Sequence, residues 1–210
     1  MMIQPGLTYV LRNAVYVALT NRALSVTLIE SRGPGFVMPA SAGFSPLPDG
    51  FEPTAAQACA AIDSRLRSAT DGFASVVFGG VGDPLVRLPT LLEVARHVRQ
   101  LGGVDDVRVT TAGLVAHEEQ ADTAAALASA GVTSASVSLG SADAAQYAEL
   151  MRPRGACGHE HVCAFVRQLV QTGLHVTCTA VAAPGVDEQA ARALSESLGA
   201  SDFKMRSYHP

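Results

Sequence analysis

Short runs rich in Val and Thr alternate along the chain with longer amphipathic segments rich in Ala and Leu. This alternation is typical of βα units, because parallel neighbouring strands need a long crossover, usually a helix, between them. Six runs have the length and composition of strands: 14–20, 74–80, 107–112, 134–139, 174–182 and 202–208. The sequence therefore predicts an α/β fold with a parallel sheet.

Two of the expected helices have recognisable ends. Thr54 and Gln57 have the spacing of a capping box and predict a helix over 54–67. Pro89 suits a first helical turn and Gly102 suits a helix end, so a second helix is expected between them. Amphipathic spacing predicts three more helices, over 118–130, 159–172 and 187–198.

The composition is that of one globular domain over 1–210. Hydrophobic residues make up 48% of the chain and charged residues 16%, which allows a sizeable buried core. A formal net charge of -4 argues against broad nucleic-acid binding, which normally needs a basic face. The chain shows no secretion signal and no apolar run of membrane-spanning length, so we expect a soluble cytoplasmic protein with reduced cysteines and no membrane partner.

The segment 21–53 follows the first predicted strand and has neither helical nor strand periodicity. Glycine and proline recur through it, so we expect a long irregular loop. Its position is significant because parallel α/β folds place their chemistry at the carboxyl ends of strands. The loop is also unusually apolar, which fits either an exposed interface or a plug folded over a cavity. Its apolar residues are Phe36, Val37, Met38, Phe44, Leu47 and Phe51.

The run YVALTNR at 16–22 resembles the first strand of radical S-adenosylmethionine (SAM) enzymes, in particular the group described as TatD-associated radical SAM proteins. The segment FGGVGDP at 78–84, followed by Arg87, is similar to the glycine-rich turn with which that family holds the methionine end of SAM. Other similar segments keep the family's order through the chain: 107–114, 137–139, Tyr147, 151–153, 184–187 and 205–208.

The resemblance implies a (βα)6 partial TIM-type barrel with SAM across its open top. In the family, three cysteines of a CxxxCxxC motif bind a [4Fe–4S] cluster in the loop after the first strand. The aligned positions here hold Ala23, Thr27 and Glu30, none of which supplies a soft sulfur ligand. We therefore expect SAM as a ligand and no [4Fe–4S] cluster. Family asparagines are also replaced, by Thr110, Ala112 and Gly140.

The glycine-rich turn is the first candidate ligand site. The backbone carbonyls of its first four residues and the Asp83 carboxylate are expected to accept hydrogen bonds from the ammonium group of SAM. A tight βα turn that needs positive φ explains the same glycines without a ligand. The residues concerned are Gly79, Gly80, Val81, Gly82 and Asp83.

Strand ends supply the remaining candidates. Family position implies that Ser138 binds a ribose hydroxyl, although plain alternation with Ser136 on a strand surface is the other explanation. Arg206 is a further cofactor-binding candidate on the last strand, where a terminal salt bridge is the alternative. The candidate acid/base residues are Asp83, Glu30 and Tyr208, with a packed ring as the alternative for the tyrosine.

Sulfur and imidazole groups also gather within seven residues at the start of a predicted helix. The four residues are Cys157, His159, His161 and Cys163. Zinc and iron use such ligands, but the spacing matches no standard metal motif and places the four on different helix faces. We therefore assign no metal here. Cys59 and Cys178 fit their amphipathic elements as structural residues, and His97 and His117 receive no role.

Three functions are consistent with these residues. The first is an enzyme that binds SAM or a related small molecule and performs polar chemistry, as a cluster-independent transferase or lyase. The second is a non-catalytic pseudoenzyme that binds a partner protein, for example an active radical SAM homologue or a second copy of itself. The third is a barrel enzyme for an anionic metabolite, with Arg87, Arg152 and Arg206 as anion-binding residues.

Overall fold

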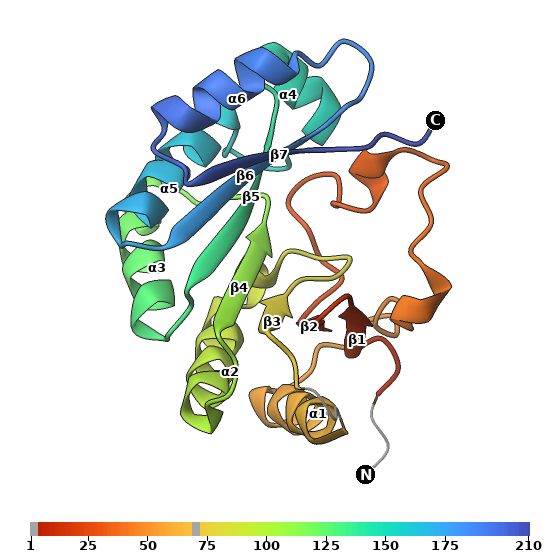
Figure 1. Ribbon diagram of the computed structural model, residues 1–210. Helices are drawn as coiled ribbons and strands as arrows, with labels where there is room; N and C mark the ends of the chain where they lie inside the picture. The colour runs from red at the N-terminus through yellow and green to blue at the C-terminus, as the bar shows by residue number, and fades with distance from the viewer. Residues whose placement is uncertain (1–3, 69–71) are drawn as a thin grey trace.

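The computed structural model describes residues 4–68 and 72–210, which form one seven-stranded sheet with its strands in chain order (Figure 1). Strands β2 to β7 are parallel, and β1 is antiparallel to β2. In the described residues the sheet stays open between β1 and β7. The strands are β1 Thr8–Leu11, β2 Ala14–Val17, β3 Ser75–Phe78, β4 Asp106–Thr111, β5 Ser134–Gly140, β6 His175–Val181 and β7 Asp202–Arg206.

The six predicted parallel strands are confirmed as β2 to β7, whereas strand β1 was missed. It pairs with β2 through a two-residue hairpin connection in which Arg12 has a φ of 54°. Such connections usually carry glycine because left-handed backbone is unfavourable for other residues. The Arg12–Asn13 dipeptide lacks this signal, which is why the hairpin was not predicted.

All five predicted helices are present, and a sixth lies after β5. This extra helix, α4, begins after Asp143, whose carboxylate accepts a hydrogen bond from Gln146 N at 2.7 Å. The predicted capping box of α1 is also present, with Gln57 N 3.2 Å from Thr54 Oγ1 and Thr54 N 2.9 Å from Gln57 Oε1. The helices are α1 Ala55–Ser68, α2 Leu88–Leu101, α3 His117–Ser129, α4 Ala144–Met151, α5 His159–Gln171 and α6 Glu188–Ser197.

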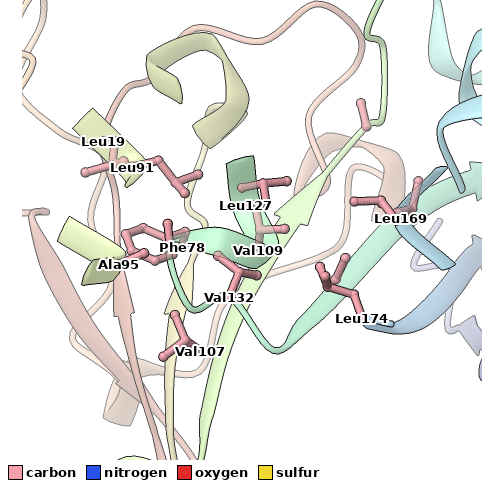
Figure 2. Packing of buried hydrophobic residues seen from close by; sticks show 14 of the residues in the cluster. Leu19, Phe78, Leu91, Ala95, Val107, Val109, Leu127, Val132, Leu169 and Leu174 are labelled. Atoms are coloured by element: carbon pink, nitrogen blue, oxygen red, sulfur yellow. The ribbon is translucent and has the colours of Figure 1, made fainter. Parts of the chain in front are cut away.

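The helices cover one face of the sheet, where the apolar side chains of the strands are buried. Figure 2 shows Phe78 and Val109 of the sheet close to Leu91 of α2 and Leu127 of α3. Successive side chains of a strand point to opposite faces, so the other residues of each strand face away from this helix layer. We call that second surface the inner face.

The inner face carries mainly polar side chains. The strand register places Ser136 between Thr110 and Thr177, and it places Thr179 between Ser138 and Lys204. The inner-face residues include Tyr16, Val77, Arg108, Thr110, Ser134, Ser136, Ser138, Thr177, Thr179, Lys204 and Arg206. Small hydroxyl side chains in the middle of the sheet leave space beside the strands that a ligand could occupy.

The predicted irregular loop over 21–53 runs from the end of β2 across to the C-terminal tail (Figure 1). It contains only two short 3₁₀ helices, η1 Glu30–Arg32 and η2 Ala40–Ala42. Val26 N donates to Met151 O at 2.7 Å, and His209 N donates to Arg32 O at 2.7 Å. These backbone hydrogen bonds tie the loop both to the end of α4 and to the tail that follows β7.

Glu52 anchors the other end of this loop. Its carboxylate accepts hydrogen bonds from Thr20 Oγ1 at 2.7 Å, from Arg22 Nε at 2.8 Å and from a terminal guanidinium nitrogen of Arg87 at 2.8 Å. Arg87 ends the 3₁₀ helix η3 Pro84–Arg87 that follows the glycine-rich turn. One carboxylate therefore joins the end of β2, the end of the loop and the segment after β3.

Glu52→Gln is expected to lower the free energy of unfolding by about 1 kcal/mol at pH 7, because the two ion pairs are lost. Hydrogen bonds from Arg22 and Thr20 lower the pKa of Glu52. Its stabilisation is therefore present above the pKa of the unfolded chain and is lost as the pH falls through the lower folded-state pKa.

Urea unfolding of wild type and variant should accordingly differ at pH 7 and converge once the pH falls below the folded-state pKa of Glu52. Glu93→Gln, which removes an exposed carboxylate from α2, is the control. An equal loss of stability in the two variants would contradict the proposed role of Glu52.

Candidate functional site

A cavity of about 280 Å³ lies at the carboxyl ends of β5, β6 and β7. Ser138, Thr179 and Arg206 line it from the inner face of the sheet. Leu28 and Glu30 line it from the loop, and Met151, Arg152 and Tyr208 complete the wall. In open parallel α/β sheets ligands bind beyond the carboxyl ends of the strands, so this is the position where a site is expected.

Two polar groups in this wall are buried without a hydrogen-bond partner among the described residues. They are Ser138 Oγ and Arg206 Nε, and Ser138 is only 4% exposed. Burial is the main cause that lowers the pKa of Arg206, and the nearby positive charge of Arg32 adds to it. Buried polar groups are nearly always hydrogen-bonded, so this pair indicates a place that a ligand or water fills.

Thr179 also lines the cavity, and the sequence analysis did not select it. Its hydroxyl lies 3.4 Å from Val137 O, a long distance for a hydrogen bond. The signal was present, because Thr179 alternates with the buried Cys178 and Ala180 of β6 and so had to face the other side of the sheet.

Tyr208 and Glu30, two of the three predicted acid/base residues, lie in the wall of the same cavity. Tyr208 reaches it because position 33 is glycine with a φ of 95°. A Cβ atom there would lie 2.8 Å from Tyr208 Cε2 and 2.2 Å from His209 O. Gly33 therefore allows the loop and the C-terminal tail to approach each other closely.

Thr27 and Glu30 satisfy each other's backbone groups. Thr27 N donates to Glu30 Oε2 at 2.9 Å, and Glu30 N donates to Thr27 Oγ1 at 3.1 Å. The pair has the T-x-x-E spacing and the reciprocal hydrogen bonds of a capping box, and it lies directly before η1, which begins at Glu30. This pattern was readable in the sequence but was not recognised there. The hydrogen bonds from Thr27 lower the pKa of Glu30 and keep its carboxylate ionised.

Three positions align with the cluster cysteines of the family. Ala23 offers only a methyl group there, and Thr27 and Glu30 hydrogen-bond to each other's backbone. Ala23 has no donor atom, and the oxygens of Thr27 and Glu30 already accept the loop's own N–H groups. These side chains do not fit the three-thiolate set that a [4Fe–4S] cluster requires.

The glycine-rich turn lies beside the main cavity. Gly80, Val81, Gly82 and Asp83 line a smaller space of about 20 Å³, which shares Ser138 with the larger one. Gly79 is buried, and a Cβ atom there would lie 3.4 Å from Thr110 Cβ. The structure therefore brings the predicted site residues, apart from Gly79, to two adjoining cavities.

The reason for glycine in this turn is close approach of two backbones. A Cβ atom on Gly82 would lie 2.5 Å from the carbonyl oxygens of Thr20 and Arg22. None of Gly79, Gly80 and Gly82 has positive φ, so the alternative explanation by a left-handed turn does not apply. The turn packs directly on the first residues of the loop, where Asp83 N donates to Arg22 O at 2.8 Å.

Asp83 uses both carboxylate oxygens inside the protein. One accepts from Leu85 N at 2.9 Å, and the other accepts from Thr111 Oγ1 and from Ala112 N, both at 2.8 Å. Burial raises its pKa although these hydrogen bonds act in the opposite direction. The side chain thus joins η3 to the end of β4. A role in acid/base chemistry or in binding an ammonium group stays a prediction.

The Cys157, His159, His161 and Cys163 group divides into separate contacts. His159 Nε2 lies 2.9 Å from Ser141 O and 3.8 Å from Cys163 Sγ. His161 instead stacks on His117 with a centroid separation of 4.1 Å. In residues 4–68 and 72–210, three side chains bring potential metal-ligand atoms within 4.8 Å of one another. They are His117, Glu160 and His161.

The aromatic residues of the loop lie outside the wall of the main cavity. Phe36 packs against His209 and under the guanidinium of Arg32, and Phe44 packs edge-on against Tyr9. The main cavity is lined without either ring. Leu47 joins the core, whereas Val37 is 81% exposed, so the loop is neither wholly a plug nor wholly an exposed patch.

No helix in the described part of the chain is long and apolar enough to cross a membrane. The predicted cytoplasmic location stays a prediction.

Comparison with known proteins shows the fold. No family model matches the chain, and no curated protein matches it. Solved structures do match: SuiB of Streptococcus suis bound to S-adenosylmethionine has a TM-score of 0.66 at 14% identity over 93% of this chain and 41% of its own.

Two further solved structures match the same fold. The radical S-adenosylmethionine methyltransferase TsrM from Kitasatospora setae, with cobalamin and a [4Fe–4S] cluster bound, has a TM-score of 0.59 at 14% identity, over 91% of this chain and 36% of its own. Methylornithine synthase (PylB) has a TM-score of 0.64 at 12% identity, over 94% of this chain and 53% of its own. The chain spans roughly a third to a half of the length of these proteins. It has the partial-barrel fold of radical SAM enzymes.

Asp83→Ala is expected to lower the free energy of unfolding by about 3 kcal/mol, because the buried partners at Thr111 and Ala112 lose their acceptor. Chemical denaturation at pH 7 measures this loss. Asp187→Ala is the matched control, since Asp187 caps α6 from an exposed position and its loss should cost about 1 kcal/mol. A loss at Asp83 no larger than at Asp187 would show that the buried contacts contribute little.

Proposed function

We propose that this protein binds SAM or a related small molecule in the cavity at the ends of β5, β6 and β7, and uses it in non-radical chemistry such as group transfer or elimination. The observation that carries the proposal is the pair of buried, unpartnered polar groups, Ser138 Oγ and Arg206 Nε, in the wall of an open cavity. The fold supports it, because one protein of this fold, SuiB, is described as bound to S-adenosylmethionine.

Different residues of the site are expected to contact different parts of SAM. The Ser138 hydroxyl is placed to hydrogen-bond a ribose hydroxyl, as the resemblance implies, and Thr179 offers a second hydroxyl beside it. The carbonyls of Gly79 to Gly82 and the Asp83 carboxylate remain the predicted acceptors for an ammonium group. Ser138 lines both the larger cavity and the small space at the turn, so a ligand beside Ser138 would lie next to the turn.

Non-radical chemistry is proposed because Ala23, Thr27 and Glu30 offer no thiolate set. When bound, SAM supplies electrophilic carbons beside a positively charged sulfur, and these need no electron transfer to react. Glu30 is the candidate base because its carboxylate lies in the cavity wall, although hydrogen bonds from Thr27 lower its pKa and with it the basicity of the carboxylate. The Tyr208 hydroxyl is the candidate acid. Positioning of the second reactant against the bound ligand would provide much of the rate.

A non-catalytic role in binding a partner protein is the second candidate function. It is favoured by the exposure of two apolar side chains on the loop over 21–53, Val37 at 81% and Leu24 at 42%. The partner would be an active radical SAM homologue or a second copy of this chain. SAM binding separates the two functions, because a pure partner protein has no need of the ligand.

Calorimetry with SAM tests the first function. Wild-type protein is expected to release or absorb heat and to gain thermal stability with SAM, and Ser138→Ala should weaken binding about fivefold, the effect of one hydrogen bond of about 1 kcal/mol. Ser136→Ala is the matched control, because Ser136 is buried on the same face of β5 but does not line either cavity. Absence of heat and of a thermal shift at millimolar SAM would overturn the proposal.

Anaerobic reconstitution with iron and sulfide tests whether the protein can bind a [4Fe–4S] cluster. Wild-type protein is expected to bind no stoichiometric iron and to show no broad visible absorption of a [4Fe–4S] cluster. A triple variant with Ala23→Cys, Thr27→Cys and Glu30→Cys is the comparison, in which gain of this absorption would show that the loop backbone still fits a cluster. Stoichiometric iron and sulfide in the wild type would exclude the cluster-free mechanism.

A further inference from the structure

Four arginines lie around the main cavity, and the negative charge of Glu30 acts on two of them, Arg152 and Arg154. Arg206 and Arg152 line it, Arg152 and Arg154 line the open groove outside it, and Arg32 lies near enough to Arg206 to lower its pKa. In the described part of the chain, no carboxylate lies within 4.0 Å of any of these four guanidinium groups. Arg87, the third anion-binding candidate of the sequence, is instead paired with Glu52.

Arg206 is the most informative of the four because it is held on the inner face of the sheet. Its strand register places it beside Val181, one row beyond Thr179 and Lys204. Its guanidinium makes no hydrogen bond to any described residue, and its Nε is buried. Keeping a guanidinium in such a place without an acceptor is costly, so the position is better explained by a ligand that supplies one.

The acidic residues of the wall do not meet this need. Glu30 and Glu149 also line the cavity, but Glu30 Oε2 accepts from Thr27 N, and neither carboxylate comes within 4.0 Å of Arg206. The chain as a whole has a net charge of -4. The four arginines therefore form a local positive region on an acidic protein, which favours the entry of an anion.

We infer that the cavity binds the oxyanion, a carboxylate or a phosphate group, of a second ligand, with Arg206 as its principal partner and Arg152 at the rim. A guanidinium suits this task because its planar N–H groups match two oxygens of one anion. The inference rests on the proposed function for the position of the site, and it adds the charge class of the molecule that reacts there.

Titration of the purified protein with inorganic phosphate and with succinate tests the inference without SAM, and neutral succinamide is the uncharged probe. Both anions are expected to bind and to raise the melting temperature, whereas succinamide should do neither. Arg206→Met should weaken anion binding at least about tenfold, and Arg152→Gln should weaken it about threefold. Arg96→Gln, on the exposed face of α2, removes the same charge elsewhere and should change nothing.

Three further measurements keep the test decisive. Arg206→Lys retains the charge but loses the forked donor geometry, so its loss of anion affinity should lie between those of wild type and Arg206→Met. Melting curves without ligand check that the variants fold. Repeating the phosphate titration with SAM present should leave phosphate affinity nearly unchanged if the anion belongs to a second ligand.

Competition between phosphate and SAM would overturn the inference, because Arg206 would then bind the carboxylate of SAM itself. Equal binding of succinate and succinamide, or equal losses at Arg206 and Arg96, would also overturn it. Failure of SAM to bind while phosphate binds through Arg206 would instead contradict only the proposed function.

Discussion

The parallel register of β2 to β7 decides both what is buried and what faces the cavity. In β5, Ala135, Val137 and Leu139 pack toward the helices, so Ser134, Ser136 and Ser138 must face the other way. The same alternation in β6 places Val176, Cys178 and Ala180 in the helix-facing layer and turns its threonines inward. A shift of register by one residue would exchange the two sets and bury the hydroxyl groups under the helices.

The loop after β2 shows how a segment without regular structure is held in place. Its backbone is joined to the end of α4 and to the C-terminal tail, and Glu52 joins its last residues to Arg22 and Arg87. The side chains of Thr27 and Glu30 hold the turn that leads into η1. Hydrogen bonds thus stabilise the region that aligns with the cluster loop of the family, and they leave the neighbouring cavity open.

The positions of the helices and parallel strands were largely predictable because their signals are local. Periodicity, capping residues and helix-ending glycine act within a few residues, as the capping box at Thr54 illustrates. The β1–β2 hairpin and helix α4 were missed because their local signals are weaker. Arg12 takes left-handed backbone without glycine at the β1–β2 hairpin, and α4 is a helix of only 8 residues that Asp143 caps.

The sequence by itself determined the order of βα units, the resemblance to radical SAM enzymes and the absence of cysteine from positions 23, 27 and 30. It also placed Ser138, Arg206, Tyr208 and Glu30 among the candidates for one site. Only the tertiary structure decided that Asp83 is engaged with Thr111 and Ala112, that Arg87 is paired with Glu52, and that Arg206 is left without an acceptor. These outcomes depend on contacts between residues about 30 or more positions apart, and such contacts follow from how the strands align and how the loop crosses them.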